Sequence, residues 1–210
     1  MSVWDEPVPV PMPDADAPLV VQVTGHRPQS FGGTSYTMTP DADWAMERVE
    51  MMLVFLKQHA ARQGRGVVLV SGMALGVDQW TVAAALRLAI PVHAVVPFPT
   101  QAELWHAQAK REYEAILTQC WRITMVRPTG PKNKAQAGTW LTDRNRWMAD
   151  YVALRAPLAC GLAVWNGQPS GTAHAVECLR ARKVPLVVID PVRKWCEVDP
   201  SFPGYTPPPA

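Results

Sequence analysis

The sequence predicts an α/β protein with a single doubly wound, mostly parallel, Rossmann-like sheet and helices on both faces. The main observation is an alternation along the chain: short continuous apolar runs are followed by longer segments with apolar residues every three or four positions. Continuous apolar runs are typical of parallel strands that are buried on both faces. A second observation is that glycine-containing loops follow three of these runs, where ligands bind in such folds.

Six apolar runs of four to eight residues predict the strands. The first, Leu-Val-Val-Gln-Val, is rich in β-branched residues and ends at a Thr-Gly loop; the second, Val-Val-Leu-Val, enters a Ser-Gly loop. In chain order the predicted strands are 19–23, 67–70, 91–96, 123–126, 158–165 and 184–189.

Five segments between these runs have apolar residues on one helical face. Gly64 is expected to end the first helix, and Pro157 the fourth. In chain order the helices are expected at about 43–63, from 77 to beyond Leu88, and at about 101–118, 142–155 and 172–182. Residues 127–138 are expected to form a polar loop.

Proline marks both ends of the chain. Of 21 prolines, five fall in residues 1–18 and six in residues 191–210. Because proline removes a backbone donor and disfavours helix, we expect flexible tails at 1–18 and 193–210 around one domain at 19–192.

The composition excludes several classes of protein. With 48% hydrophobic residues and 210 residues in total, the chain can bury a full core. A net charge of +2 argues against a dedicated nucleic-acid-binding protein. The four cysteines are widely spaced, so we expect no metal site and no disulfide framework. The sequence shows no signal peptide and no membrane span, which predicts a cytoplasmic protein.

The loop from Ser71 to Asp78 is the first candidate site. Gly72 and Gly76 allow close approach of a ligand, and the amide groups at the start of the following helix attract an anion such as phosphate. Asp78 would repel phosphate, so we expect it to cap the helix or to accept a hydrogen bond from a ribose hydroxyl. A tight turn without a ligand remains an alternative interpretation.

The loop after the fifth predicted strand is the second candidate. The hydroxyl groups of Ser170 and Thr172 and the amide of Gly171, with Gly167 at the turn, can cradle a phosphate. The alternative is an ordinary N-capped helix, for which Ser and Thr are equally suited.

The loop after the first strand contains Gly25, His26 and Arg27. The guanidinium of Arg27 suits phosphate or carboxylate. His26 is interpreted as a neutral hydrogen-bonding residue, with a catalytic base as the alternative.

Arg144 and Asn145 stand close to the expected start of a helix, with Arg146 nearby. The helix dipole disfavours cations there, which favours an anionic ligand or an acidic neighbour for one arginine. A solvated surface pair is the alternative.

Standard nucleotide-binding and hydrolase signatures such as Gly-x-Gly-x-x-Gly and Gly-Lys-Ser/Thr are absent from the sequence. The loops, in their order, instead resemble the SLOG superfamily, which unites the DprA/Smf proteins with the LOG phosphoribohydrolases, and within it the YpsA-like branch of bacteria and phages. The motifs that carry the resemblance are Thr24-Gly25-His26-Arg27-Pro28, Ser71-Gly72-x-Ala74-x-Gly76-x-Asp78 with Trp80, Pro97-Phe98 with Gln101 and Trp105, Arg144-Asn145-x-x-Met148, and Gly167 with Gly171-Thr172.

The resemblance implies a Rossmann-like domain that binds a nucleotide at these loops. In the phosphoribohydrolases an arginine of an Arg-Lys-x-x-Met motif and a glutamate two places after Gly-Thr serve catalysis. Arg144 matches that arginine, but Asn145 replaces the lysine and His174 stands where the glutamate would be. Hydrolysis of an N-glycosidic bond would therefore lack its expected carboxylate.

These observations favour a cytosolic protein that binds a nucleotide or an ADP-ribose-like derivative, acting as a ligand sensor. We expect no cofactor besides this nucleotide ligand, and the sequence leaves a homodimer open. One alternative is a nucleotide N-glycosidase that uses Asp78 or Glu177. A second is DprA-like binding of single-stranded DNA through a basic cluster formed by Lys110, Arg111, Lys132, Lys134 and Arg144.

Overall fold

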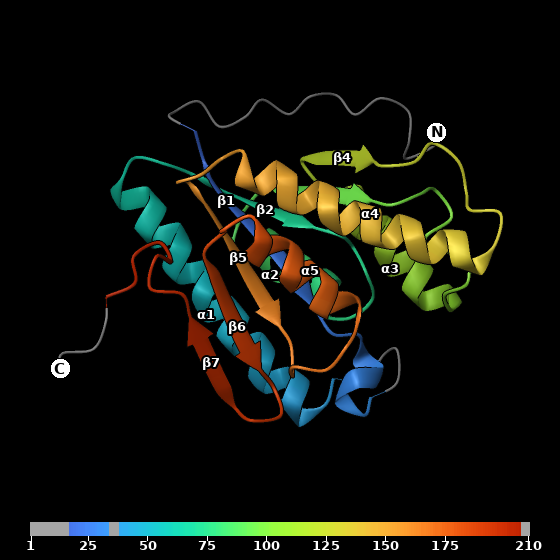
Figure 1. Cartoon of the computed structure of the whole chain (residues 1–210), viewed down its shortest axis with the longest axis horizontal. Coiled ribbons are helices and arrows are strands. Elements are labelled where there is room, and N and C mark those ends of the chain that lie inside the picture. Colours follow the sequence, from blue (N-terminus) through green and yellow to red (C-terminus); the bar gives the residue numbers. More distant parts are fainter. Residues whose placement is uncertain (1–16, 34–37, 207–210) are drawn as a thin grey trace.

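The computed structural model describes residues 17–33 and 38–206. At its centre lies a seven-stranded sheet with the strand order β4-β3-β2-β1-β5-β6-β7 (Figure 1). Neighbouring strands are parallel except for β7, which runs antiparallel to β6. The strands are β1 (Leu19–Gly25), β2 (Val67–Ser71), β3 (Val92–Val96), β4 (Arg122–Met125), β5 (Ala159–Val164), β6 (Leu186–Asp190) and β7 (Trp195–Val198).

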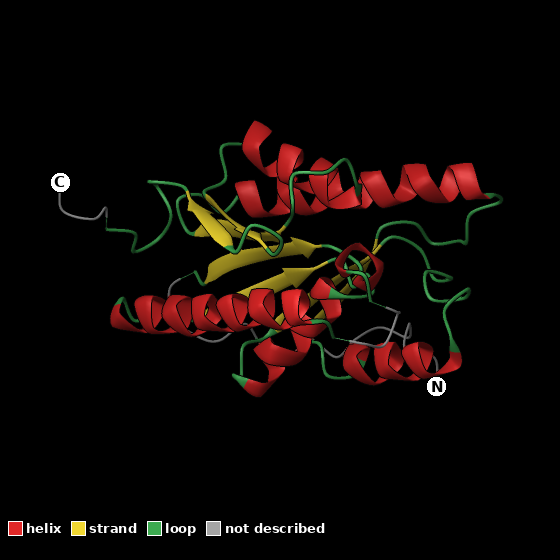
Figure 2. Cartoon of the chain, turned by 90° about the horizontal axis from the view of Figure 1, so that it is seen from below, coloured by secondary structure: helices red, strands yellow, loops and turns green. Residues whose placement is uncertain are grey.

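Helices cover both faces of the sheet (Figure 2). Alternate side chains of β1 enter two separate cores: Val21 and Val23 on one face and Val20 on the other. The first face is covered by α1 (Pro40–Arg62), α2 (Val77–Arg87) and α3 (Ala107–Leu117), the second by α4 (Lys134–Ala153) and α5 (Gly171–Ala181). The predicted fold class is confirmed.

The structure differs most from the predicted elements at α4, which begins at Lys134, eight residues before the expected start. The side chain of Asn133 caps the helix by accepting a hydrogen bond from the amide of Gln136 at 2.9 Å. The prediction of a loop over 127–138 is therefore wrong for its last five residues. Arg144 lies in the middle of a helix, so the argument from the dipole at a helix start does not apply to it.

Two further segments differ. Helix α3 begins at Ala107 instead of residue 101, because the preceding residues form turns and His106 caps the helix. In the segment 193–210, predicted as a tail, the structure places β7 and the buried side chain of Phe202. Residues 1–16 and 207–210 of the two predicted tails lie outside the described residues.

Over residues 17–33 and 38–206, no helix combines the length and the apolar character needed to cross a membrane. The same residues contain no group of three or more His, Cys, Asp or Glu side chains placed to hold a metal ion.

Candidate functional site

The order of the strands places a crevice beside β1. From β1 the chain proceeds outward through β2, β3 and β4 on one side, and β5 and β6 lie on the other. The loops after β1, β2 and β5 therefore meet at the carboxyl ends of three neighbouring strands. In doubly wound sheets this switch point is where ligands bind.

A pocket of about 590 Å³ lies at this switch point. Nine of the thirteen predicted site residues line it: Gly25, His26, Arg27, Asp78, Arg144, Asn145, Ser170, Gly171 and Thr172. The remaining four, Ser71, Gly72, Gly76 and Gly167, do not line the pocket and lie in the loops that form it. Three residues of α4 that the sequence analysis did not select also line it: Gly138, Leu141 and Thr142.

Gly138 and Leu141 were missed because α4 was expected to begin only at 142, and Thr142 because it was expected at the helix start and not on a pocket-lining face. Their spacing of three and four positions continues to Asn145, which puts them on one helical face. The side chain of Asn133 followed by Gln136 was the available indication of an earlier start.

Arg144 is the cationic group at the centre of the site. It extends from α4 over the β2–α2 loop, and its guanidinium lies against Gly72, so closely that a Cβ atom at that position would overlap Cζ and Nη1. The residue is only 7% exposed, and its Nε and Nη1 atoms are buried without a hydrogen-bond partner. The absence of a side chain at Gly72 thus creates the space that Arg144 occupies.

Asp78 is the acidic counterpart of Arg144. Its Oδ2 lies 3.9 Å from Nη1 of Arg144, within ion-pair distance but too far for a hydrogen bond. The same oxygen accepts a hydrogen bond from the amide of Ala74 at 3.3 Å. Burial raises the pKa of Asp78, and the positive charge of Arg144 opposes this shift.

The carboxylate of Asp78 stands in the first turn of α2 and holds the β2–α2 loop. This bond holds the loop ahead of the helix and is not a helix cap, because Ala74 precedes Gly76, the N-cap residue, which has no side-chain cap. The start of α2 consequently faces its own carboxylate. The amide of Val77 is also engaged, because it donates to the carbonyl oxygen of His26 at 3.2 Å.

The β2–α2 loop is held rigidly by buried side chains. Ser71 Oγ accepts a hydrogen bond from the amide of Met73 at 3.2 Å, and Gln101 donates to the carbonyl oxygen of Met73 at 2.8 Å. Gly76 has a φ of +93°, and a Cβ there would lie 2.7 Å from the carbonyl oxygen of His26. Glycine is therefore required where this loop meets the β1 loop.

His26 connects the loops after β1 and β5. Its Nε2 lies 2.8 Å from Oδ1 of Asn166 and 3.1 Å from the amide nitrogen of the same residue. Asn166 Oδ1 accepts a hydrogen bond from the amide of Gln168 at 3.1 Å. The imidazole is 3% exposed, and burial lowers its pKa, so it is neutral at pH 7. This geometry corresponds to the hydrogen-bonding role expected for His26.

The start of α5 supplies hydrogen-bond donors to the pocket. Ser170 caps the helix by accepting from the amide of Ala173 at 3.1 Å. The first amide groups of a helix have no partner within it, and Gly171 and Thr172 place two of them beside the pocket. Asn145 joins this end to α4, because its Nδ2 donates to the carbonyl oxygen of Gly171 at 3.1 Å.

With this geometry in place, comparisons with known proteins address the fold. No protein-family model and no curated protein sequence matches the chain. The solved structures provide the decisive similarity. In fold, this chain is similar to DNA processing protein A.

The structure of DprA from Streptococcus pneumoniae matches over 82% of this chain and 50% of its own, with 17% identity and a TM-score of 0.52. A DprA structure from Helicobacter pylori, described for its single-stranded DNA binding mode, matches over 82% and 66%, with 19% identity and a TM-score of 0.55. The chain thus spans between half and two thirds of these DprA chains. The similarity is one of fold.

The basic cluster proposed for a DprA-like role is not one surface. Arg144 is buried in the pocket, whereas Arg111 is exposed on α3. The carboxylates proposed for a hydrolase also differ: Asp78 lines the pocket, whereas Glu177 is exposed and lies outside the lining.

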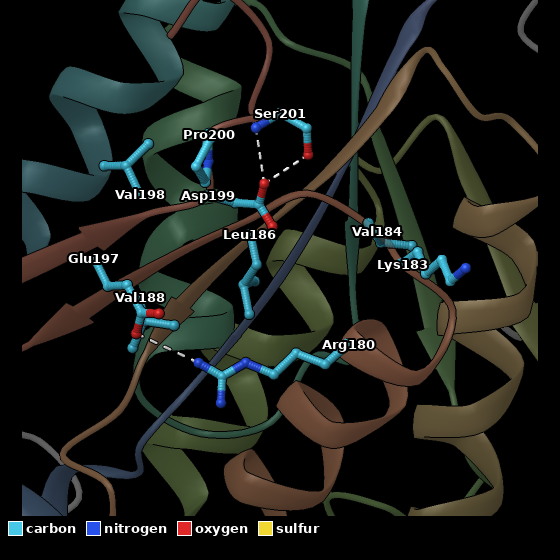
Figure 3. A pocket seen from close by; sticks show the side chains of 10 residues that line it. All are labelled: Arg180, Lys183, Val184, Leu186, Val188, Glu197, Val198, Asp199, Pro200 and Ser201. Carbon is cyan, nitrogen blue, oxygen red and sulfur yellow. Dashed lines mark hydrogen bonds and ion pairs between the residues drawn. The ribbon is translucent and has the colours of Figure 1, made fainter. Parts of the chain in front are cut away.

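A smaller hollow of about 360 Å³ lies beside β6 and β7, away from the predicted site (Figure 3). Three of its four charged side chains, Arg180, Glu197 and Asp199, have partners, and the fourth, Lys183, is exposed. Arg180 pairs with Glu197 at 3.4 Å, and Asp199 accepts hydrogen bonds from both the amide and the hydroxyl of Ser201. Both cations of this hollow, Arg180 and Lys183, are exposed, whereas Arg144 is buried.

Proposed function

We propose that the pocket at the switch point binds a nucleotide or a nucleotide-derived ligand through an anionic group held by Arg144. The observation that carries this proposal is the buried guanidinium with two unpartnered nitrogen atoms. An unpaired buried donor costs roughly 1–3 kcal/mol, and more when it belongs to a charged group. An anion in the pocket would supply the missing acceptors.

Asp78 alone does not compensate Arg144. At 3.9 Å it attracts the guanidinium without a hydrogen bond, and its own burial raises its pKa. Arg27, exposed at the rim of the pocket, adds a second positive charge. Two arginines and one carboxylate leave an excess of positive charge in the pocket, which suits a phosphate group.

The start of α5 is the complementary part of this site. The free amides of Gly171 and Thr172 and the hydroxyl of Thr172 can hydrogen-bond phosphate oxygens, and the helix dipole favours negative charge there. Asp78, on the other wall, would accept a hydrogen bond from a sugar hydroxyl. Together these groups support a ligand that carries both an anion and a polyol.

Cleavage of a nucleotide N-glycosidic bond is the second candidate, because Asp78 is a buried carboxyl with a raised pKa inside the pocket. Carboxyl groups of this kind serve as general acids. A third candidate, single-stranded DNA binding as described for the Helicobacter pylori DprA, has less support in this chain, because its net charge is only +2.

A thermal-shift screen tests the proposal directly. The compounds are AMP, ADP, ATP, NAD, ADP-ribose, cyclic nucleotides and oligothymidine, each with the wild type, Arg144→Lys and Arg146→Lys. Arg146 is the matched control, since it lies on the same helix, is exposed and pairs with Asp143 at 3.0 Å. A ligand at 100 times its Kd stabilises the fold by about 2.7 kcal/mol.

We expect one class of nucleotide to stabilise the wild type and the Arg146 variant, with affinity for the Arg144 variant lowered about tenfold or more. This loss follows because lysine cannot replace the guanidinium fork. Equal stabilisation of all three proteins, or of none by any compound, contradicts the proposal. Release of free base in the same samples indicates the hydrolase, and salt-sensitive binding of oligothymidine alone indicates DNA binding.

A further inference from the structure

A second groove lies at the amino ends of the strands, opposite the carboxyl ends where the candidate site lies. It has a volume of about 520 Å³ and is formed where β1, β2 and β4 begin and where α4 ends. Its lining includes Ala17, Trp121, Arg122, Tyr151, Leu154 and Arg155. We call it the amino-edge groove.

Aromatic rings form one wall of the amino-edge groove. Tyr151 stacks on Trp147 with ring centres 5.2 Å apart, and the buried ring of His93 meets Tyr151 edge-on at 4.8 Å. The guanidinium of Arg155 lies 3.5 Å above the ring of Tyr151. The Tyr151 ring is thus covered by Trp147 and Arg155, and the surface left to solvent is that of Leu154, which is 84% exposed at the rim, and of the half-buried Trp121. Grooves lined by aromatic rings are the usual docking sites of proline-rich segments.

The charge of the groove is positive. Arg122 and Arg155 line it, and none of the described residues in the lining is acidic. Arg65 lies at its entrance, where Nη1 donates to the carbonyl oxygen of Ala17 at 3.0 Å. An occupant of matching chemistry would therefore be both proline-rich and acidic.

The chain itself contains such a segment. Residues 1–16, which precede the described part, have prolines at four alternate positions (7, 9, 11 and 13), four acidic residues and no lysine or arginine. The chain leaves this segment at Ala17, which already lines the groove. A segment joined directly to its binding site has an effective concentration in the millimolar range, so weak contacts suffice for binding.

We propose that residues 1–16 dock in the amino-edge groove of their own chain. The acidic residues of this segment match the positive charge of Arg122 and Arg155, and its prolines match the half-buried ring of Trp121. This interaction is separate from the proposed nucleotide site, which lies at the other ends of the strands, so the two proposals can fail independently.

The experiment compares the full-length wild type with a full-length variant in which residues 1–16 are replaced by a Gly/Ser sequence of equal length. Amide and indole NMR shifts report on the groove through Trp121, Leu154 and Arg155. We expect these signals to differ between the two proteins while signals around Arg144 coincide. Identical groove signals in both proteins overturn the proposal.

A synthetic peptide of residues 1–16 gives the second measurement. The Gly/Ser variant should bind it saturably at the same groove signals. The wild type should bind it about tenfold more weakly, as expected for an intrinsic Kd of about 0.1 mM against a tethered competitor at about 1 mM. Equal affinity for both proteins, or groove shifts in the wild type that depend on protein concentration, would mean that a segment from another copy or partner occupies the groove and that docking within one chain is wrong.

Charge reversal supplies the matched control. Arg122→Glu, at an exposed groove position, should weaken peptide binding about threefold to tenfold and reduce its salt dependence. Arg111→Glu changes an equally exposed arginine outside the groove and should leave the affinity unchanged. The same effect from both variants would show that general charge, and not this groove, determines binding, and would overturn the proposal.

Discussion

Replacing Gly72 by alanine tests the central geometric feature of the site. The backbone of Gly72 is outside the left-handed region, so alanine causes no strain in the chain itself. Its methyl group would instead overlap the guanidinium of Arg144. The guanidinium therefore has to leave its position, 3.9 Å from the carboxylate of Asp78.

Two effects determine how much stability and how much ligand affinity the substitution removes. Overpacking of a filled interior costs about 1–3 kcal/mol of folding free energy. A displaced guanidinium also loses its charged hydrogen bonds to a bound anion, each contributing about 1.5–3 kcal/mol. We therefore expect Gly72→Ala to destabilise the protein by about 1–3 kcal/mol and to weaken ligand binding by about tenfold or more.

Urea unfolding of a double-mutant cycle separates the clash from other effects of the substitution. In the background of Arg144→Ala, the methyl group that Gly72→Ala introduces has no guanidinium to meet, so most of the destabilisation should disappear. A coupling of at least about 1 kcal/mol between the two positions is expected. If Gly72→Ala costs the same free energy in both backgrounds, the reasoning about this contact is refuted.

Three further predictions concern pH, helix propensity and capping. Burial lowers the pKa of His93 to about 3, whereas the unfolded chain takes up this proton near pH 6.5. The contribution of neutral His93 to the free energy of unfolding is therefore fully present above pH 6.5 and is lost as the pH drops toward 3, by about 3 kcal/mol at pH 4.5. Urea unfolding should show this decrease in the wild type and not in His93→Gln. Gly138→Ala, in α4 with open space around a new Cβ, should raise the melting temperature through about 0.5–1 kcal/mol of helix propensity, and a decrease would show that the pocket needs a bare backbone there. Ser170→Ala leaves the amide of Ala173 unpaired and should destabilise α5 by about 1 kcal/mol, whereas Ser170→Asp should retain most of the stability in the same melting assay.

The apolar pattern predicted the sheet because strands that are buried on both faces consist of continuous apolar runs. The runs at 19–23 and 67–70 became β1 and β2 with small changes at their ends. Strand β7 was not predicted, because it lies at the edge and is partly exposed, so its residues carry no continuous apolar run. The early part of α4 was missed for a similar reason: its polar residues resemble a loop unless the capping side chain of Asn133 is considered.

Glycine-containing loops after the right strands were sufficient to locate the crevice, because topology brings the carboxyl ends of parallel strands together. The contact between Gly72 and Arg144 could not be predicted, since it joins residues that are 72 positions apart through the packing of α4 on the sheet. The premise that led to Arg144, a position at a helix start, was wrong, although the residue does lie in the pocket. The acidic neighbour that the premise required is Asp78, from the first turn of α2.

Helices α2 and α5 both begin at the crevice. The charge at their first turns differs, and this difference predicts how a ligand is oriented in the proposed site. The start of α2 is occupied by the carboxylate of Asp78, which receives the amide of Ala74, and by the bond from Val77 to His26. The start of α5 is capped by the uncharged Ser170, so its dipole is not neutralised by a carboxylate of its own. An anion between the two walls would be repelled from α2 and attracted to α5 and Arg144. For the proposed ligand we therefore expect the phosphate end at α5 and the hydroxyl-bearing end at Asp78. A methyl ester on the phosphate should weaken binding, and removal of a sugar hydroxyl should weaken it independently.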